Sequence, residues 1–321
     1  MFENNVYEKI KKLDLKNQQK EEFCILTHKK HGREIYFIKS DKKAIKFMKF
    51  KFKSPLKMIL YYLIKFGLAQ PFLKKIKLNS GHGQLIFVGG QIKIFNFLNK
   101  EVISFPKYKN ENKKFIKSKE YQRKLGKKNF APKINTINKI LFYSKEELLE
   151  DYNLNTYVPI FKKLIKFYFD EGIKKISVNS FINYLKKRLK KSPIKDDFFT
   201  KTLDKIKKEN IKLDLMTTFL HGDLSKEQVL KRDKLIVLTD WNPRKGLIID
   251  DLVNFFRGVE DLLNNKEFCN YLKLFPKEVQ KNIGLYLILN EINFICDFPL
   301  RRPPLAKIRI KNLFPFFMKK D

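Results

Sequence analysis

The fold of this chain is decided by a stretch that reads Phe219-Leu220-His221-Gly222-Asp223-Leu224-Ser225-Lys226-Glu227-Gln228-Val229-Leu230, followed after a charged turn by Leu235-Ile236-Val237-Leu238-Thr239-Asp240-Trp241. Two carboxylates, Asp223 and Asp240, each follow an apolar run and flank a polar loop and a hairpin. Phosphoryl transfer uses such a pair of carboxylates. One orients the attacking hydroxyl and accepts its proton, and the other holds the metal that bridges the nucleotide phosphates.

These residues resemble the aminoglycoside phosphotransferase and choline kinase-like group of the protein-kinase-like fold. In that group HGDxxxxN precedes a strand ending in D-W or D-F, then a Gly and a further Asp on a helix, which correspond here to Gly246 and Asp251. The resemblance implies that Asp223 is the catalytic Asp, assisted by His221, and that Asp240 is a magnesium ligand. His221 and Asp251 would brace the loop. It also implies ATP or GTP as phosphoryl donor and Mg²⁺ as cofactor.

One position departs from the pattern of the group. Gln228 stands where the group has Asn, and the resemblance implies that it is the second magnesium ligand. Gln keeps the carboxamide oxygen but adds a methylene, whereas Mg²⁺ requires near-ideal octahedral geometry. Either the backbone shifts to compensate or the second metal contact is weakened.

The sequence from residue 76 to residue 152 has the alternating texture of strands. Short apolar runs separated by Gly and Asn turns predict an antiparallel meander followed by a helix. The predicted strands are Leu85–Val88, Gln91–Phe97 and Glu101–Phe105, and the predicted helix is Lys114–Leu125. A kinase-like small lobe needs these elements.

Such a lobe also needs a strand lysine and a helix glutamate whose ion pair positions the α- and β-phosphates. The best candidates are Lys107 and Glu120, with Lys93 as the competitor for the lysine. Gly81 and Gly83 are candidates for a loop over the phosphates, because glycine lets backbone amides approach an anion. A plain turn is the equally supported reading of these two glycines.

The fold class that follows is α+β, with a small antiparallel-sheet lobe and a larger helical lobe rather than a repeating βαβ order. We divide the chain into an N-terminal extension at 1–75, a kinase-like N-lobe at 76–152 and a helical C-lobe at 153–321. The extension is expected to contain a hairpin, a strand-like alternating run at Lys46–Lys53 and an apolar helix from Pro55 to about Gln70. In the C-lobe, helices are predicted at Val178–Lys191, Asp196–Lys208, Asp250–Asn264 and Pro276–Ile295.

The charge is the unusual part of the composition. Lys and Arg number 69 against 34 acidic residues, which gives a formal net charge of +35. A charge of this size concerns partners and solubility rather than fold. Only nine of the basic residues are Arg, and this scarcity argues against specific reading of nucleic acid, which favours Arg. An anionic small molecule or glycan, or an anionic membrane surface, is the kind of partner expected.

No apolar run reaches the roughly 20 residues of a bilayer span, and no signal peptide is recognisable, so a cytoplasmic location is expected. Residues 58–73, flanked by lysines, are either a helix packed on the lobe or an interfacial helix that lies on a membrane. Three widely spaced cysteines, Cys24, Cys269 and Cys296, argue against a disulfide framework or a zinc site.

We therefore expect an ATP- and Mg²⁺-dependent phosphotransferase whose acceptor is a hydroxyl of a small molecule such as a sugar, amino-sugar or glycan. Two alternatives stay open. The first is a catalytically impaired, kinase-like nucleotide-binding protein, for which Gln228 would be the trace of lost metal binding. The second is a Lys-rich protein associated with nucleic acid.

Overall fold

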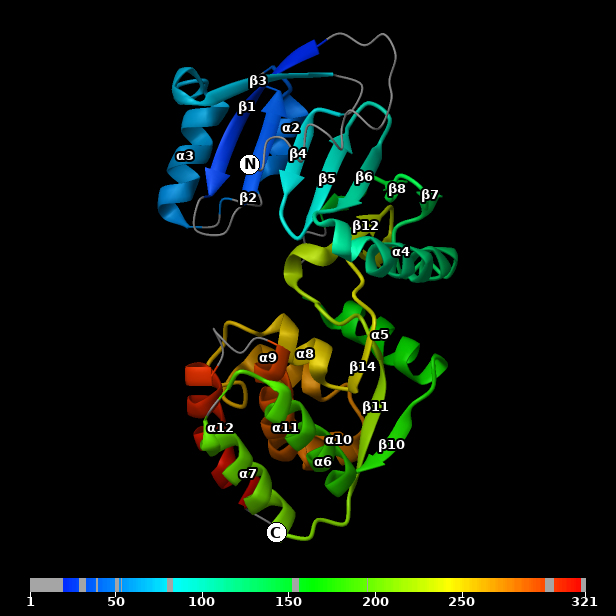
Figure 1. Cartoon of the computed structure of the whole chain (residues 1–321), viewed down its shortest axis with the longest axis vertical. Helices are drawn as coiled ribbons and strands as arrows, with labels where there is room; N and C mark the ends of the chain where they lie inside the picture. The colour runs from blue at the N-terminus through cyan, green and yellow to red at the C-terminus, as the bar shows by residue number, and fades with distance from the viewer. Residues whose placement is uncertain are drawn as a thin grey trace. The chain divides into compact units, whose positions relative to one another are not determined.

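The computed structural model describes residues 20–28, 33–38, 40–49, 52, 54–79, 83–151, 156–194, 196–297 and 303–318. The chain forms two compact units, one of residues 1–152 with 229–239 and one of residues 153–228 with 240–321 (Figure 1). The first unit is built on an antiparallel sheet, and the second consists mainly of helices. The expectation of an α+β fold with a sheet-rich part and a helical part is confirmed.

The first unit contains one large sheet with strand order β3-β1-β2-β4-β5-β6-β8-β7. Its strands are β1 (Lys20–His28), β2 (Arg33–Ile38), β3 (Lys74–Asn79), β4 (Leu85–Val88), β5 (Gln91–Asn96), β6 (Glu101–Pro106), β7 (Ile134–Asn138) and β8 (Tyr143–Glu147). A small sheet has the order β13-β12-β9, with β9 (Glu150–Asp151), β12 (Val229–Arg232) and β13 (Leu235–Leu238). The helices are α2 (Lys42–Met48), α3 (Pro55–Lys65) and α4 (Asn112–Lys127). The predicted hairpin and meander are confirmed, and the two join because β2 pairs with β4.

Alternation of apolar residues explains why this sheet has a core on both faces. Along β4, Ile86 and Val88 pack into one apolar cluster, and Leu85 and Phe87 pack into another on the opposite face. Buried residues of α2 and α3 belong to the second cluster, so these two helices cover that face (Figure 1). Strands and helices of the predicted extension thus share one core with the strands of the predicted N-lobe.

The prediction of a strand-like run at Lys46–Lys53 is wrong, because its first residues lie in helix α2. Asp41 caps this helix by accepting a hydrogen bond from the backbone N of Ala44 at 2.8 Å. Ala44, Ile45 and Met48 are buried on one helical face. An alternation of Lys with Phe or Met over a few residues fits a strand and an amphipathic helix equally well. The residue that indicates a helix here, the N-cap Asp41, lies before the alternating run.

The second unit contains a three-stranded sheet of order β10-β11-β14 surrounded by helices. The strands are β10 (Lys174–Ser177), β11 (Asp214–Leu220) and β14 (Arg244–Leu247). The helices are α5 (Val158–Asp170), α6 (Val178–Lys191), α7 (Asp197–Lys208), α8 (Asp250–Phe255), α9 (Lys266–Leu272), α10 (Lys277–Lys281), α11 (Ile283–Asp297) and α12 (Pro303–Met318). A short 3₁₀ turn occurs here at Lys226–Gln228, and two others occur in the first unit at Gln70–Phe72 and Lys109–Glu111. Among the described helices, none is long and apolar enough to span a bilayer.

The predicted helix Asp250–Asn264 is too long, since α8 ends at Phe255. After the helix ends, the carbonyls of Arg257 and Val259 accept hydrogen bonds from the buried guanidinium of Arg309. Arg309 lies in α12, a helix for which the sequence analysis made no prediction. A buried cation from a distant part of the sequence therefore holds the backbone that follows α8.

Candidate active site

The loop that follows β11 is held by a single buried carboxylate. Asp251, at the start of α8, accepts hydrogen bonds from the backbone N of His221 at 2.7 Å and of Gly222 at 2.9 Å. The hydroxyl of Tyr168 donates to the same carboxylate at 2.7 Å. Burial and the charge of Asp251 raise the pKa of Tyr168, so the phenol remains a donor. These contacts fit the bracing role that the resemblance implies for Asp251.

Gly222 cannot be replaced by a residue with a side chain. Its φ is +88°, and a Cβ atom there would lie 2.0 Å from the backbone O of Asn242. The backbone N of Asn242 donates in turn to the O of His221 at 2.9 Å. The loop that carries Asp223 is therefore packed directly against the segment that carries Asp240.

His221 is fully buried, and its ring lies 4.7 Å from the ring of Trp241. Asp240, which directly precedes Trp241, adopts a left-handed backbone conformation with φ of +60°. A non-glycine residue in this region is strained and is retained where the surrounding structure fixes it, which is frequent at functional sites. This backbone conformation thus occurs at the residue for which a magnesium role is predicted.

Asp223 is partly exposed and lies among several charged groups. Burial raises the pKa of its carboxyl above the ordinary value, Arg257 and His221 oppose the shift, and the negative charges of Asp240 and Asp251 add to it. An Nη of Arg257 lies 3.4 Å from an Oδ of Asp223, whose side chain is 53% exposed. A carboxylate with a raised pKa is a better proton acceptor, provided that it remains ionised at the working pH.

Arg257 was not identified by the sequence analysis, although a signal was present. The chain has only nine Arg residues in a background of lysine, so each Arg stands out. In the second unit Arg188, Arg244 and Arg309 also form hydrogen bonds with carboxylates. Pairing with carboxylates is typical of Arg, because its planar guanidinium presents several N–H donors in a fixed geometry.

The oxygen donors near Asp223 are of the kind that Mg²⁺ binds. Asp240 offers a carboxylate and Gln228 a carboxamide oxygen, and hard oxygen ligands suit this ion. The Oε1 atom of Gln228 accepts a hydrogen bond from the backbone N of Ser225 at 2.7 Å, and the side chain is buried. One lone pair of that oxygen is therefore already used within the loop. In the described part of the chain no three acidic, His or Cys side chains form a metal cluster.

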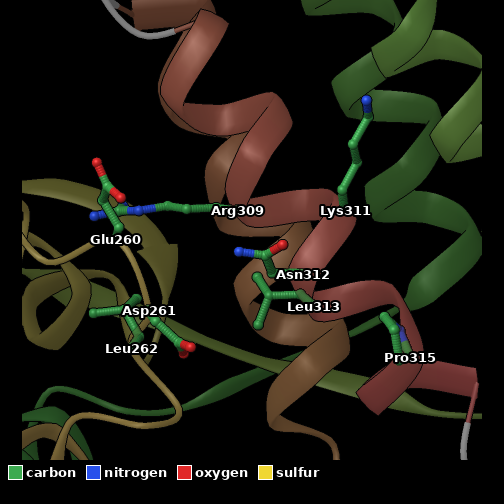
Figure 2. Close-up of a pocket in the computed structure, with 8 residues that line it drawn as sticks. All are labelled: Glu260, Asp261, Leu262, Arg309, Lys311, Asn312, Leu313 and Pro315. Carbon is green, nitrogen blue, oxygen red and sulfur yellow. The ribbon is translucent and has the colours of Figure 1, made fainter.

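Arg309 fixes the backbone that carries Arg257. Its guanidinium pairs with Glu291 of α11 and donates to the carbonyls of Arg257 and Val259. Figure 2 shows Arg309 extending from α12 toward the segment of Glu260, beside a pocket of about 460 Å³. Acidic residues of that segment, Glu260 and Asp261, line the pocket together with α12.

The first unit contains a buried ion pair that the sequence analysis missed. Lys119 of α4 donates to Glu146 of β8 at 3.2 Å, and both side chains are at most 3% exposed. The carboxylate also accepts hydrogen bonds from Ser104 at 3.0 Å and from Gln122 at 2.5 Å. This is a lysine–glutamate pair between helix and strand, but the helix supplies the lysine and the strand supplies the acid.

The structure places the predicted pair of Lys107 and Glu120 differently. Glu120 lies on α4 with its carboxylate 2.5 Å from the ammonium of Lys139, and its side chain is 43% exposed. Lys107 follows β6, is buried, and has its ammonium 5.5 Å from the ring centre of Tyr108. The geometry gives no support to Glu120 as the residue that orients Lys107. The competitor Lys93 is directly opposite Ser104 in the register of β5 and β6.

Of the two candidate loop glycines, Gly81 lies outside the described residues. Gly83 precedes β4 with φ of +106°, and a Cβ atom there would lie 2.4 Å from the backbone O of Phe95. Close packing against β5 thus accounts for glycine at this position. A role over phosphates stays a prediction for both.

Comparison with solved structures finds small-molecule kinases of the group that the catalytic-loop residues resemble. The chain is similar to the choline kinase LicA from Streptococcus pneumoniae, with 14% identity over 73% of this chain and 91% of that chain and a TM-score of 0.48. It is also similar to a choline/ethanolamine kinase family protein from Mesorhizobium loti, with 12% identity, coverage of 74% and 87%, and a TM-score of 0.45. A third is the aminoglycoside phosphotransferase APH(4)-Ia, with 11% identity, coverage of 74% and 90%, and a TM-score of 0.47.

No family model matches the sequence, and no curated protein matches it either. At the identities of the solved structures, the likeness concerns the fold. The activity has to be inferred from this chain's own residues.

Proposed function

We propose that this chain is a phosphotransferase that moves the terminal phosphoryl group of ATP to a hydroxyl of a small molecule. The observation that supports the proposal most directly is the placement of Asp223. Its partly exposed carboxylate has a raised pKa and lies on a braced loop next to Arg257 and within the field of Asp240.

In the proposed reaction the acceptor hydroxyl attacks the γ-phosphorus, a new P–O bond forms, and the bond to the bridging oxygen of ADP breaks. Asp223 orients the hydroxyl and takes its proton. The guanidinium of Arg257 lies beside that carboxylate and would stabilise the negative charge on the oxygens of the transferred phosphoryl group. Asp240, with Gln228, would hold Mg²⁺, which neutralises phosphate charge when bound.

For the acceptor we propose a sugar, amino-sugar or glycan-type hydroxyl. The formal charge of +35 supports an anionic one, because a basic protein concentrates anions near its surface. A screen of hydroxyl compounds with γ-labelled ATP, including acidic sugars and matched neutral ones, tests this. Transfer to neutral sugars with no advantage for the acidic ones would contradict the anionic acceptor but leave phosphotransfer intact.

One observation favours a second function, a nucleotide-binding protein without transfer activity. The oxygen that would bind the second metal already accepts the N–H of Ser225. A thermal-shift titration with ATP, with and without Mg²⁺, separates the two. We expect Mg²⁺-dependent stabilisation together with ATP turnover. Stabilisation without turnover for any acceptor would support the second function, and no nucleotide effect at all would contradict both.

We further propose that Lys119, and not Lys107, is the lysine of the first unit that contacts the nucleotide phosphates. Its ion pair with Glu146 joins a helix to a strand, as the pair that holds such a lysine in kinases does, but here the helix supplies the lysine. Removing a charged hydrogen bond to phosphate costs about 1.5–3 kcal/mol, or about tenfold or more in affinity. We therefore expect the double variant K119M/E146Q to raise the KM for ATP by at least about tenfold.

The double variant is designed to fold. Met fills the space of Lys119, and the glutamine that replaces Glu146 retains partners in Ser104 and Gln122, so no buried charge is left alone. K107M is the matched control, since it removes another buried lysine of the same unit. A larger rise in KM for K107M than for the double variant would restore Lys107 to the role.

A further inference from the structure

Helix α3 and the turn after it expose an unusual amount of apolar side chain. Among the described residues, eight of the seventeen large hydrophobic side chains that are exposed fall between Leu56 and Phe72. Leu56 is 80% exposed, Phe66 69% and Phe72 88%. We name this the α3 surface and define it by Leu56, Ile59, Leu63, Phe66, Leu68 and Phe72. A contiguous patch of this kind marks an interaction site more often than scattered single residues do.

The exposure does not come from a loosely attached helix. Tyr61 and Ile64, on the other side of α3, are buried in the core of the first unit with residues of β1 and β2. The side-chain amide of Gln70 donates to the backbone O of Ile64 at 3.0 Å and fixes the turn that follows. Ser54 caps the start of the helix. The helix is therefore anchored by one apolar side and presents a second apolar side to solvent.

The stretch of sequence that contains α3 is strongly basic. Residues 42–79 contain eleven lysines and neither Asp nor Glu. On the helix itself, the ammonium of Lys65 lies 5.8 Å from the ring centre of Tyr62 and 5.5 Å from that of Phe66. The ammonium thus lies against two aromatic rings of this helix, as in a cation–π contact.

We propose that the α3 surface docks this protein on an anionic lipid bilayer, whatever reaction the protein catalyses. A bilayer interface accepts both features at once, because apolar side chains enter the acyl boundary while lysines neutralise headgroups. A second copy of the chain would bring the same lysines into contact and be repelled. Nucleic acid would pair with the lysines but leave the apolar side chains in water.

The test is vesicle co-sedimentation of the purified full chain. We expect binding to vesicles of phosphatidylcholine with phosphatidylglycerol, weak binding to phosphatidylcholine alone, and a decrease as salt is raised. The variant I59E/F66E places two acids on the α3 surface and should lower the partition coefficient for anionic vesicles at least about tenfold. Both positions are exposed, so the variant should unfold at the same temperature as the wild type.

The matched control is L98E/I140E, which adds the same charge at two positions that are 78% and 85% exposed in turns of the same unit. The control should bind vesicles nearly as well as the wild type. Equal loss in both variants would show that only net charge matters and would overturn the proposal. Binding that is absent in the wild type would do the same. A wild-type dimer that I59E/F66E dissociates, with no vesicle binding, would assign the surface to a second copy.

Discussion

Replacing Asp223 by Asn is expected to lower kcat for phosphotransfer at least about a hundredfold while ATP-dependent thermal stabilisation is retained. The amide has the shape of the carboxylate but cannot accept the hydroxyl proton, and a positioned proton acceptor contributes about 10²–10⁴-fold. The side chain is partly exposed and its ion pair with Arg257 is 3.4 Å long, so the loss of charge should not unfold the loop. Steady-state kinetics with labelled ATP measures the effect.

The pH dependence gives an independent check on the same residue. Burial raises the pKa of Asp223, and an acceptor of a proton must be ionised, so kcat/KM should fall as the pH is lowered through this raised value. The variant should lack this acid limb. Asp233→Asn, in the exposed turn between β12 and β13, is the control and should behave as the wild type. Turnover by D223N at the wild-type rate would remove Asp223 from the mechanism.

The sequence indicated the second unit's loop through its resemblance to a known family, because the constraints on the loop fix residue types at set spacings. Gly222 has to be glycine where the chain passes Asn242, and an Asp must follow on a helix to accept the freed backbone N–H groups. Such requirements leave a spaced pattern in the sequence. The strands of the meander could also be predicted, because an apolar run and adjacent turn residues such as glycine mark each of them in the sequence.

The ion pair of Lys119 and Glu146 in the first unit has no comparable pattern in the sequence. Lys119 is one of many lysines on a predominantly polar helix, and only packing against β6 and β8 makes it the buried one. Glu120, the neighbour chosen from sequence, instead pairs with Lys139 on the exposed face. Which of two adjacent helix residues faces a sheet depends on the phase of the helix, and a uniform lysine background hides that phase.

Asp251 carries the largest stability effect that we expect in the second unit. The variant D251N should lower the free energy of unfolding by about 3 kcal/mol or more. Three donors converge on this carboxylate, from Tyr168, His221 and Gly222. The amide oxygen of the variant can accept from some of these donors, but its NH₂ group then faces a remaining donor. Each buried donor without an acceptor costs about 1–3 kcal/mol. The single Trp of the chain, Trp241, is buried beside His221, so its fluorescence reports this unit in a urea titration.

The adjacent aspartate provides a control with the opposite expectation. Burial raises the pKa of Asp250 to about 7, against the opposing effects of Arg244 and Asn290. The unfolded chain has an ordinary pKa of about 3.9, so the folded state binds more protons between about pH 4 and 7, and stability falls as the pH rises through that window. Asp250→Asn removes the buried charge and should match the wild type in stability below about pH 4 and exceed it at pH 8. If D250N and D251N were equally destabilised at pH 8, the loss would reflect disturbed packing of α8 and not the three hydrogen bonds of Asp251.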